Sequence, residues 1–281
     1  MATLICAAAI NYEIRPVPDF NGFIAHMDEL IEAAAAQGAQ LIVFPESIDL
    51  ERLAYAPEVS DAQVKDFLAR DTQRTFDYLQ KISAEKDITI IGGSHMFDTG
   101  AGVVNRALIV QRGRMTFQDK LILTQYEIAP WGLMPGAGLY PVGDIGVTVC
   151  YDSEFPSSGR ALADAGVLVQ CVPAYTETRY GFQRVRWSCQ ARAIEHQNYV
   201  IHTSLVGNLG REPIVSTFGN SAILCPSFEP FPISGALAQT ADNVEAIAIA
   251  DLDLDLLYAV RNSGDVRNFN DRDKGDFTIH R

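Results

Sequence analysis

The 281-residue sequence has no long apolar run and no excess of basic residues. Its apolar stretches, such as Leu4–Ile10, are far shorter than the roughly 20 residues that a membrane-spanning helix needs. Lysine and arginine total 22 against 35 aspartate and glutamate, which gives a net charge of −13. Binding to nucleic acid or to an anionic membrane depends on a basic patch, and no such cluster stands out. We therefore expect neither nucleic acid nor membrane as a partner.

Cysteine is scarce, and its positions form no metal-binding pattern. The five cysteines are Cys6, Cys150, Cys171, Cys189 and Cys225. No pair has the C-x-x-C spacing of a zinc site, and the histidines lack H-E-x-x-H spacing. No dinucleotide-binding glycine fingerprint or P-loop is present. The N-terminus lacks the basic region and cleavage site of a signal peptide. These features predict a reduced, cytoplasmic protein.

Apolar periodicity predicts alternating strands and helices. Leu4–Ile10 and Leu41–Phe44 are typical of buried strands, and Phe23–Ala36 between them has the period of a helix. Such units build parallel sheets covered by helices. Further helices are predicted at Thr72–Lys86, Ser157–Ala165 and Phe182–His196. Further strands are predicted at Ile88–Ile91, Arg106–Arg112, Arg114–Asp119, Ile145–Cys150, Val167–Val172, Tyr199–Leu205, Ile214–Thr217, Ser221–Leu224 and Val244–Ala250.

Two pairs of these strands are expected to form hairpins, one around Gly113 and one around Gly219-Asn220. The chain has no flexible linker and no short repeat, and it has more strands than a simple doubly wound sheet needs. We therefore expect one α/β domain over residues 1–281 with more than one sheet layer. Its polar tail from about residue 261 is a segment that a partner subunit could order.

Three polar residues follow predicted strands. Glu46 follows the Leu41–Phe44 strand, Lys120 follows a second strand, and Cys150 ends a third. Ligands bind at the carboxyl ends of strands in open α/β sheets. A thiol, a carboxylate and an amine there can act as nucleophile, proton carrier and oxyanion stabiliser. Each residue also has an ordinary interpretation, because cysteine often fills cores and the two charged residues could be solvated.

The sequence after Cys150 separates it from the other cysteines. A polar turn, Tyr151–Pro156, leads into a predicted helix. A thiol aimed at a helix N-terminus has a lowered pKa. The other four cysteines lie in apolar runs or within a helix, which indicates a packing role.

Three short motifs resemble those of the nitrilase superfamily of carbon–nitrogen hydrolases. They are Phe44-Pro45-Glu46, Asp119-Lys120-Leu121 and Val149-Cys150-Tyr151-Asp152-Ser153-Glu154-Phe155-Pro156, and they occur in that family's order with similar spacing. Ala191–Val200 resembles the family's "ARAIEN" block, and the resemblance extends over nearly the whole chain. It implies a four-layer αββα sandwich that needs no metal or organic cofactor.

The resemblance also implies a role for each residue. Cys150 attacks the substrate carbon, Glu46 moves the protons, and Lys120 with the backbone N–H of Tyr151 stabilises the oxyanion. Glu127 resembles a second glutamate that holds the lysine or the substrate amine. The alternative for Glu127 is a solvated loop carboxylate.

The residues after Cys150 resemble the amidase branches rather than the Cys-Trp-Glu-Asn of true nitrilases. This predicts hydrolysis of a small linear carboxamide to a carboxylic acid and ammonia through a thioester. Three alternatives stay open: a nitrilase, an N-carbamoyl-amide hydrolase and a non-catalytic member that only binds ligands.

Loop residues around the site are expected to select the substrate. The candidates are Trp131, Tyr175, Thr176, Glu177, Arg179, Arg184 and Arg186. An arginine that reached the site could pair with a substrate carboxylate, whereas elsewhere it would be solvated or lie in an interface. The resemblance further implies a homodimer or a larger homo-oligomer.

Overall fold

The computed structural model describes residues 4–273 and 279, and its centre consists of two facing sheets. The strands are β1 Leu4–Ile14, β2 Leu41–Phe44, β3 Thr89–Asp98, β4 Val103–Gln111, β5 Arg114–Asp119, β6 Ile145–Val147, β7 Val169–Tyr175, β8 Tyr199–Gly207, β9 Ala222–Leu224, β10 Ala236–Gln239 and β11 Ala246–Asp253. One sheet has the order β11-β1-β2-β3-β4-β5, and the other has the order β6-β7-β8-β9-β10. Pairing between the ends of β1 and β8 joins the two sheets.

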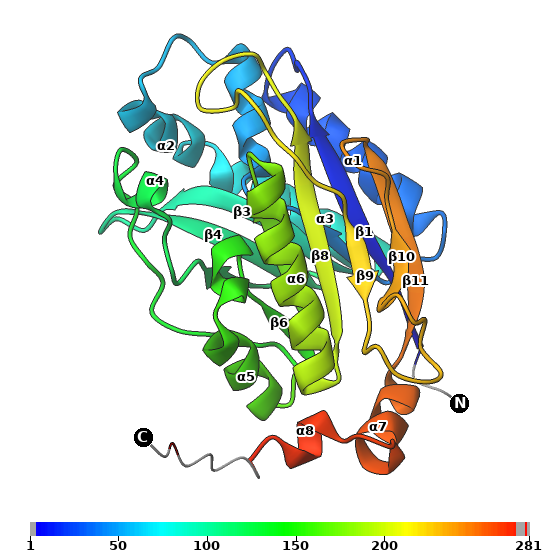
Figure 1. Cartoon of the computed structure of the whole chain (residues 1–281). Helices are drawn as coiled ribbons and strands as arrows, with labels where there is room; N and C mark the ends of the chain where they lie inside the picture. Colours follow the sequence, from blue (N-terminus) through cyan, green and yellow to red (C-terminus); the bar gives the residue numbers. More distant parts are fainter. Residues whose placement is uncertain (1–3, 274–278, 280–281) are drawn as a thin grey trace.

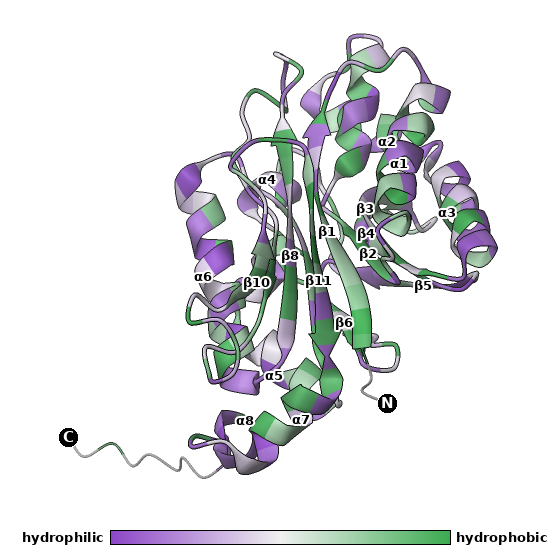
Figure 2. Cartoon of the chain, turned by 90° about the vertical axis from the view of Figure 1, so that its right-hand side faces the viewer, coloured by the Kyte–Doolittle hydropathy of each residue, from purple (hydrophilic) through white to green (hydrophobic). Residues whose placement is uncertain are grey.

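Helices cover the outer face of each sheet (Figures 1 and 2). The helices are α1 Phe20–Ala35, α2 Asp61–Ala69, α3 Thr72–Lys86, α4 Gln125–Ile128, α5 Pro156–Asp164, α6 Arg179–His196, α7 Leu254–Ser263 and α8 Asn268–Asp271, with 3₁₀ turns η1 Ile48–Tyr55 and η2 Cys150–Glu154. Alternate residues of β1 face opposite sides: Ala7 and Ala9 pack between the sheets, whereas Ala8 and Ile10 pack under α1. The result is the four-layer αββα sandwich that the motifs implied. No helix in the described part of the chain is long and apolar enough to cross a membrane.

One prediction for the second sheet is wrong. The predicted hairpin between Ile214–Thr217 and Ser221–Leu224 does not form, because residues 214–217 are not a strand. Only Ala222–Leu224 is one, and it pairs with β8 and β10. The loop before β9 uses its polar groups elsewhere: Thr217 donates to the carbonyl of Gly207, and the Phe218 N–H donates to the carbonyl of Thr176. The hairpin around Gly113 is confirmed.

One strand of the first sheet is longer than predicted and continues through a pair of glycines. The strand predicted at Ile88–Ile91 continues as β3 to Asp98, and its register with β4 shifts at Gly92-Gly93. Gly93 has φ +72°, and a Cβ there would lie 2.3 Å from the carbonyl oxygen of Pro45. Only glycine accepts both this conformation and this approach. The bulge therefore lies directly against the chain that leads into Glu46.

The strand directions bring the carboxyl ends of four strands to one edge of the sandwich. β2 and β3 are parallel, and β5 again runs with β3 because β4 is antiparallel to both of its neighbours. β6, β7 and β8 are parallel to one another, and β8 is parallel to β1. The carboxyl ends of β2, β5, β6 and β7 therefore share one edge, together with the amino end of β4.

The C-terminal residues described by the structure form helices that pack within the chain. The buried guanidinium of Arg261, in the last turn of α7, donates to the backbone carbonyls of His196 and Gln197. A role for a partner in ordering the tail stays a prediction. The last part of the segment it concerns, residues 274–278 and 280–281, lies outside the described residues.

Candidate functional site

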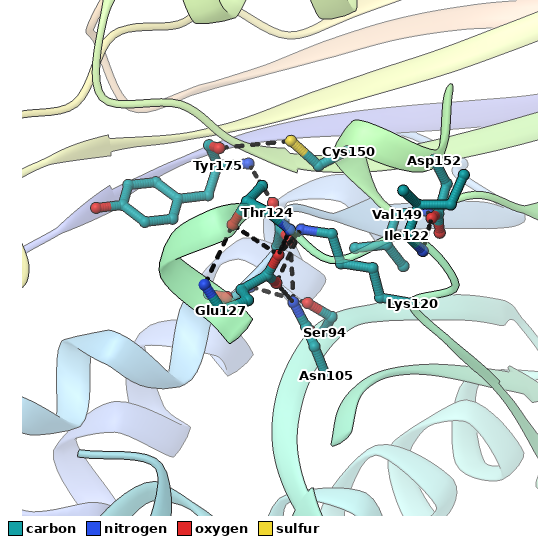
Figure 3. A network of polar contacts seen from close by, with 12 residues as sticks. Ser94, Asn105, Lys120, Ile122, Thr124, Glu127, Val149, Cys150, Asp152 and Tyr175 are labelled. Atoms are coloured by element: carbon teal, nitrogen blue, oxygen red, sulfur yellow. Dashed lines mark hydrogen bonds and ion pairs between the residues drawn. The ribbon is translucent and has the colours of Figure 1, made fainter. Parts of the chain in front are cut away.

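The edge formed by the strand ends brings the four candidate residues together. Figure 3 shows Lys120, Glu127 and Cys150 there. Glu46 lies just after β2, Lys120 directly after β5, Cys150 at the start of η2, and Glu127 on α4. All four are at least nine-tenths buried. Three ionisable groups and a thiol thus share a space that excludes most water.

Lys120 is held between the two glutamates. Its ammonium lies 2.8 Å from a carboxylate oxygen of Glu46 and 2.8 Å from one of Glu127. Asn105, near the amino end of β4, donates its side-chain N–H to the same two carboxylates, at 3.0 and 3.1 Å. The second oxygen of Glu46 accepts the backbone N–H of Tyr175 at 2.9 Å. Every component of this network is fixed by at least two others.

Glu127 is part of the local structure of α4. One of its carboxylate oxygens accepts the backbone N–H of Thr124 at 2.8 Å, and the Thr124 side chain caps the helix in return. This is a capping box, for which the spacing Thr-x-x-Glu is a sequence signal. The side chain is buried, so the interpretation of Glu127 as a solvated loop carboxylate is wrong.

The buried charges perturb one another. Burial opposes charge on Lys120, but Glu46 and Glu127 raise its pKa well above the ordinary value. Burial raises the pKa of Glu46, more than the nearby ammonium lowers it. Burial raises the pKa of Glu127 too, but the Lys120 charge and several hydrogen bonds outweigh this effect, so the pKa lies below the ordinary value. Lys120 and Glu127 therefore stay ionised, and Glu46 is the carboxyl of the two that takes up a proton more readily.

Cys150 occupies an unusual backbone conformation. Its φ is +46°, a left-handed value that costs energy in a non-glycine residue. The thiol donates to the carbonyl oxygen of Tyr175 at 3.5 Å, and the Glu46 carboxylate lies close enough to raise the thiol pKa. The turn thus places the sulfur beside Glu46.

The expected lowering of the Cys150 pKa by a helix N-terminus is wrong. Cys150 begins the short η2 turn, and the next helix starts only at Pro156. Burial raises the pKa of the thiol, and the negative charge of Glu46 raises it further. The resting sulfur is therefore protonated, so its activation needs a base within hydrogen-bond distance.

The sequence analysis missed two polar residues of the site. Asn105 bridges the two glutamates, as described above. Asp152 accepts the backbone N–H groups of Leu121, Ile122 and Val149 at 2.7–3.2 Å, and thereby ties the segment after Lys120 to the Cys150 turn. An asparagine inside the apolar β4 sequence was the available signal for the first. The second lies in a motif that was recognised, but two of its partners, Leu121 and Ile122, are 31 and 30 residues away in the chain.

A cavity of about 660 Å³ opens from the cysteine. Tyr151, predicted to stabilise the oxyanion, lines it, as do the uncharged substrate candidates Trp131, Tyr175 and Thr176. Of the charged loop candidates, Glu177 and Arg184 line it too. Among residues 4–273 and 279, no three His, Cys, Asp or Glu side chains gather as a metal site would require.

The other two arginine candidates lie outside the cavity. Arg179 is exposed and pairs with Asp242 at 3.4 Å. Arg186 is buried, where it donates to Asn220 and to His202. The structure therefore leaves Arg184 as the arginine of the three that a ligand in the cavity could meet.

Comparison with known proteins identifies relatives along almost the whole chain. A probable hydrolase, YhcX, from Bacillus subtilis (strain 168) is 32% identical over 96% of this chain. The chain spans about half of that relative, 54% of its length. A deaminated glutathione amidase from Synechocystis sp. (strain PCC 6803 / GT-S) is 28% identical, and the match covers 91% of this chain and 94% of that protein.

A solved structure has the same fold. An amidase from Nesterenkonia sp. AN1, in which acrylamide has added to the active site cysteine, superimposes with a TM-score of 0.72 at 20% identity. The match covers 92% of this chain and 96% of that one. The model of the carbon–nitrogen hydrolase family matches residues 6–262. This chain therefore belongs to the carbon–nitrogen hydrolase family, the nitrilase superfamily that its motifs resemble.

Proposed function

We propose that the protein hydrolyses a small linear carboxamide to a carboxylic acid and ammonia, with Cys150 as nucleophile. The observation that carries this proposal is the buried Lys120 held between Glu46 and Glu127, next to the Cys150 thiol and at the base of one cavity. A thiol beside a carboxylate that can take its proton, together with a fixed positive charge that can stabilise an oxyanion, are groups that support acyl transfer.

In the first half of the reaction, Glu46 takes the thiol proton as the Cys150 sulfur attacks the amide carbon. The carbonyl oxygen becomes negatively charged, and Lys120 with the backbone N–H of Tyr151 stabilises that charge. Glu46 then gives its proton to the leaving nitrogen. The C–N bond breaks, ammonia leaves, and the acyl group remains on sulfur as a thioester.

In the second half, Glu46 takes a proton from a water molecule, whose oxygen attacks the thioester carbon. The C–S bond breaks, the carboxylic acid forms, and the sulfur recovers its proton from Glu46. Glu127 contacts Lys120 throughout and acts as a positioning residue. Lys120 stays charged in both halves because the two carboxylates raise its pKa.

The relatives support amides as the substrate class. Those reported above include a deaminated glutathione amidase and an amidase with an active site cysteine. A nitrile or an N-carbamoyl compound would require the same nucleophile, so the reaction products must distinguish these possibilities.

The test is ammonia release from a panel of short aliphatic amides, dicarboxylate monoamides, N-carbamoyl amino acids and nitriles. Cys150→Ala should abolish release while leaving the thermal unfolding temperature near that of the wild type. Cys6→Ala, which removes a half-buried thiol far from the cavity lining, should keep full activity. Release that survives in Cys150→Ala would overturn the mechanism, and release from nitriles alone would overturn the amide assignment.

We also propose that the protein self-associates through α6. Tyr180, Trp187 and Ile194 are spaced seven residues apart and form one exposed apolar stripe, with exposures of 84%, 63% and 44%. Exposed apolar patches of this kind are typical of interfaces. Sedimentation should show a dimer or larger species, and Trp187→Glu should yield the 30.8 kDa monomer. A wild-type monomer at micromolar concentration contradicts this proposal.

The chemistry also fits a reducing compartment. All five cysteines are free thiols, and the proposed nucleophile must remain reduced to act. We therefore propose a cytoplasmic location, which fractionation of the source cells would test.

A further inference from the structure

Arg184 is the cationic side chain of α6 that lines the cavity. The cavity holds one other cationic residue among the described side chains, Lys120, and both proposed catalytic carboxylates already engage it. Arg184 is therefore the group that remains to meet a charge on the part of the substrate that does not react.

Its partner Glu154 ties Arg184 to the turn that carries the cysteine. Glu154 is the last residue of η2, and Cys150 is the first, so the rise of a 3₁₀ turn places their backbones about 8 Å apart. Cys150, Glu154 and Arg184 line the same cavity. A short substrate that reacts at the sulfur can therefore extend along this cavity toward Arg184.

The Arg184–Glu154 contact is loose and engages one nitrogen. Arg184 Nε lies 3.4 Å from a Glu154 carboxylate oxygen, which is an ion pair without good hydrogen-bond geometry. Among the described residues, no other partner of Arg184 is found, and its side chain is 62% exposed. Its two terminal nitrogens are therefore available for a second carboxylate, which a guanidinium binds in a bidentate manner.

Part of the cavity lining is uncharged. Tyr151, Thr176 and Val185 line the cavity together with Gly181, and these suit the methylene groups of a short chain. Glu177 is a lining carboxylate that opposes this arrangement, because it would repel an anionic substrate and attract a cationic one.

We propose that Arg184, positioned by Glu154, is a specificity-determining residue that binds a carboxylate at the far end of the substrate. The preferred substrates are then monoamides of short dicarboxylic acids. This inference rests on the proposed amide hydrolysis and adds the substrate class and the residue that reads it.

Three amides of matched length test the inference: succinamate, butyramide and 3-aminopropanamide end in a carboxylate, a methyl group and an ammonium group. The wild type should have the highest kcat/KM for succinamate. Arg184→Gln should lower the succinamate-to-butyramide ratio of kcat/KM by about tenfold, and Arg184→Glu should favour 3-aminopropanamide. Arg179→Gln is the matched control, because it removes an arginine of the same helix outside the cavity. It should leave the ratio unchanged.

Binding provides a readout that does not depend on turnover. In the Cys150→Ala background, calorimetry should detect succinamate binding that Arg184→Gln weakens by about tenfold. An unchanged ratio and unchanged binding in Arg184→Gln overturn the inference, as does a wild-type preference for the ammonium substrate, which would assign recognition to Glu177. If the wild type hydrolyses none of the three amides but succinamate binding still depends on Arg184, the proposed function is refuted and the inference about Arg184 is not.

Discussion

Replacing Glu127 by glutamine removes one negative charge from the site while keeping its shape. The new amide oxygen can still accept from Lys120 and Asn105, which contact one carboxylate oxygen at 2.8 and 3.1 Å. The other oxygen becomes an NH₂ group and faces two donors, the Thr124 N–H and the Lys120 ammonium, which each lie 2.8 Å from that oxygen in the wild type. The variant thus loses an ion-pair partner of Lys120 and one bond of the α4 capping box.

The expected loss of stability is modest. Removing one partner of a buried ion pair costs about 3–5 kcal/mol when the other charge is left alone. Lys120 is not left alone, because it keeps Glu46 at 2.8 Å. The cost is therefore nearer that of one or two hydrogen bonds, about 1–3 kcal/mol. Thermal unfolding should shift by roughly 2–4 °C for each kcal/mol.

The expected loss of activity is larger than the loss of stability. Without the Glu127 charge, the Lys120 ammonium is free to move toward Glu46 and away from the developing oxyanion. Losing one preorganised electrostatic contact of this kind lowers kcat by about 10²–10³-fold. The pKa of Glu46 should also fall, because the Glu127 charge contributes to raising it, and the acid limb of the pH–rate profile should move to lower pH.

The assay combines steady-state hydrolysis of a short amide from pH 4 to 9 with thermal unfolding. Glu58→Gln is the control, since Glu58 is an exposed loop carboxylate outside the cavity. Wild-type kcat in Glu127→Gln would refute the positioning role. A drop in kcat that merely follows a large loss of folded protein would refute it as well.

Three further predictions concern the surrounding structure. Gly93→Ala would place a Cβ 2.3 Å from a backbone carbonyl at φ +72°, so it should lower both the unfolding temperature and kcat, and an active, stable variant contradicts this. Because burial raises the pKa of Glu46 and the base must be ionised, wild-type kcat/KM should fall with decreasing pH above the ordinary carboxyl range; a profile flat down to pH 4 would exclude Glu46 as the base. Burial lowers the pKa of His26, but hydrogen bonds to Glu245 and Glu51 raise it from 6.5 to about 9. The charged form thus stabilises the fold fully below pH 6.5, and this contribution is lost as pH rises through 9; the urea midpoint should decline over that range in the wild type and much less in His26→Gln.

The sequence by itself determined the elements whose signals are local. The helix predicted at Thr72–Lys86 and the strand at Leu41–Phe44 have the observed bounds, because periodicity and flanking residues lie within each segment. Three polar residues at strand ends, in one chain order, also indicated a common edge and the family. The Thr-x-x-Glu spacing could have located Glu127, since a capping box is complete within four residues.

Only the tertiary structure decided which side chains meet. Asn105 joins the site because β4 runs opposite to its neighbours, and the strand's own sequence does not state its direction. The pKa of Cys150 rises because burial and Glu46 outweigh the charge of Lys120 and the hydrogen bond to the Tyr175 backbone. Arg184 reaches the cavity while Arg186 turns inward, although only one residue separates them. Local signals depend on neighbours in the chain. Burial, charge and convergence depend on segments far apart in it, such as Glu46 and Tyr175, which are 129 residues apart and in contact, and only the packed sandwich brings those together.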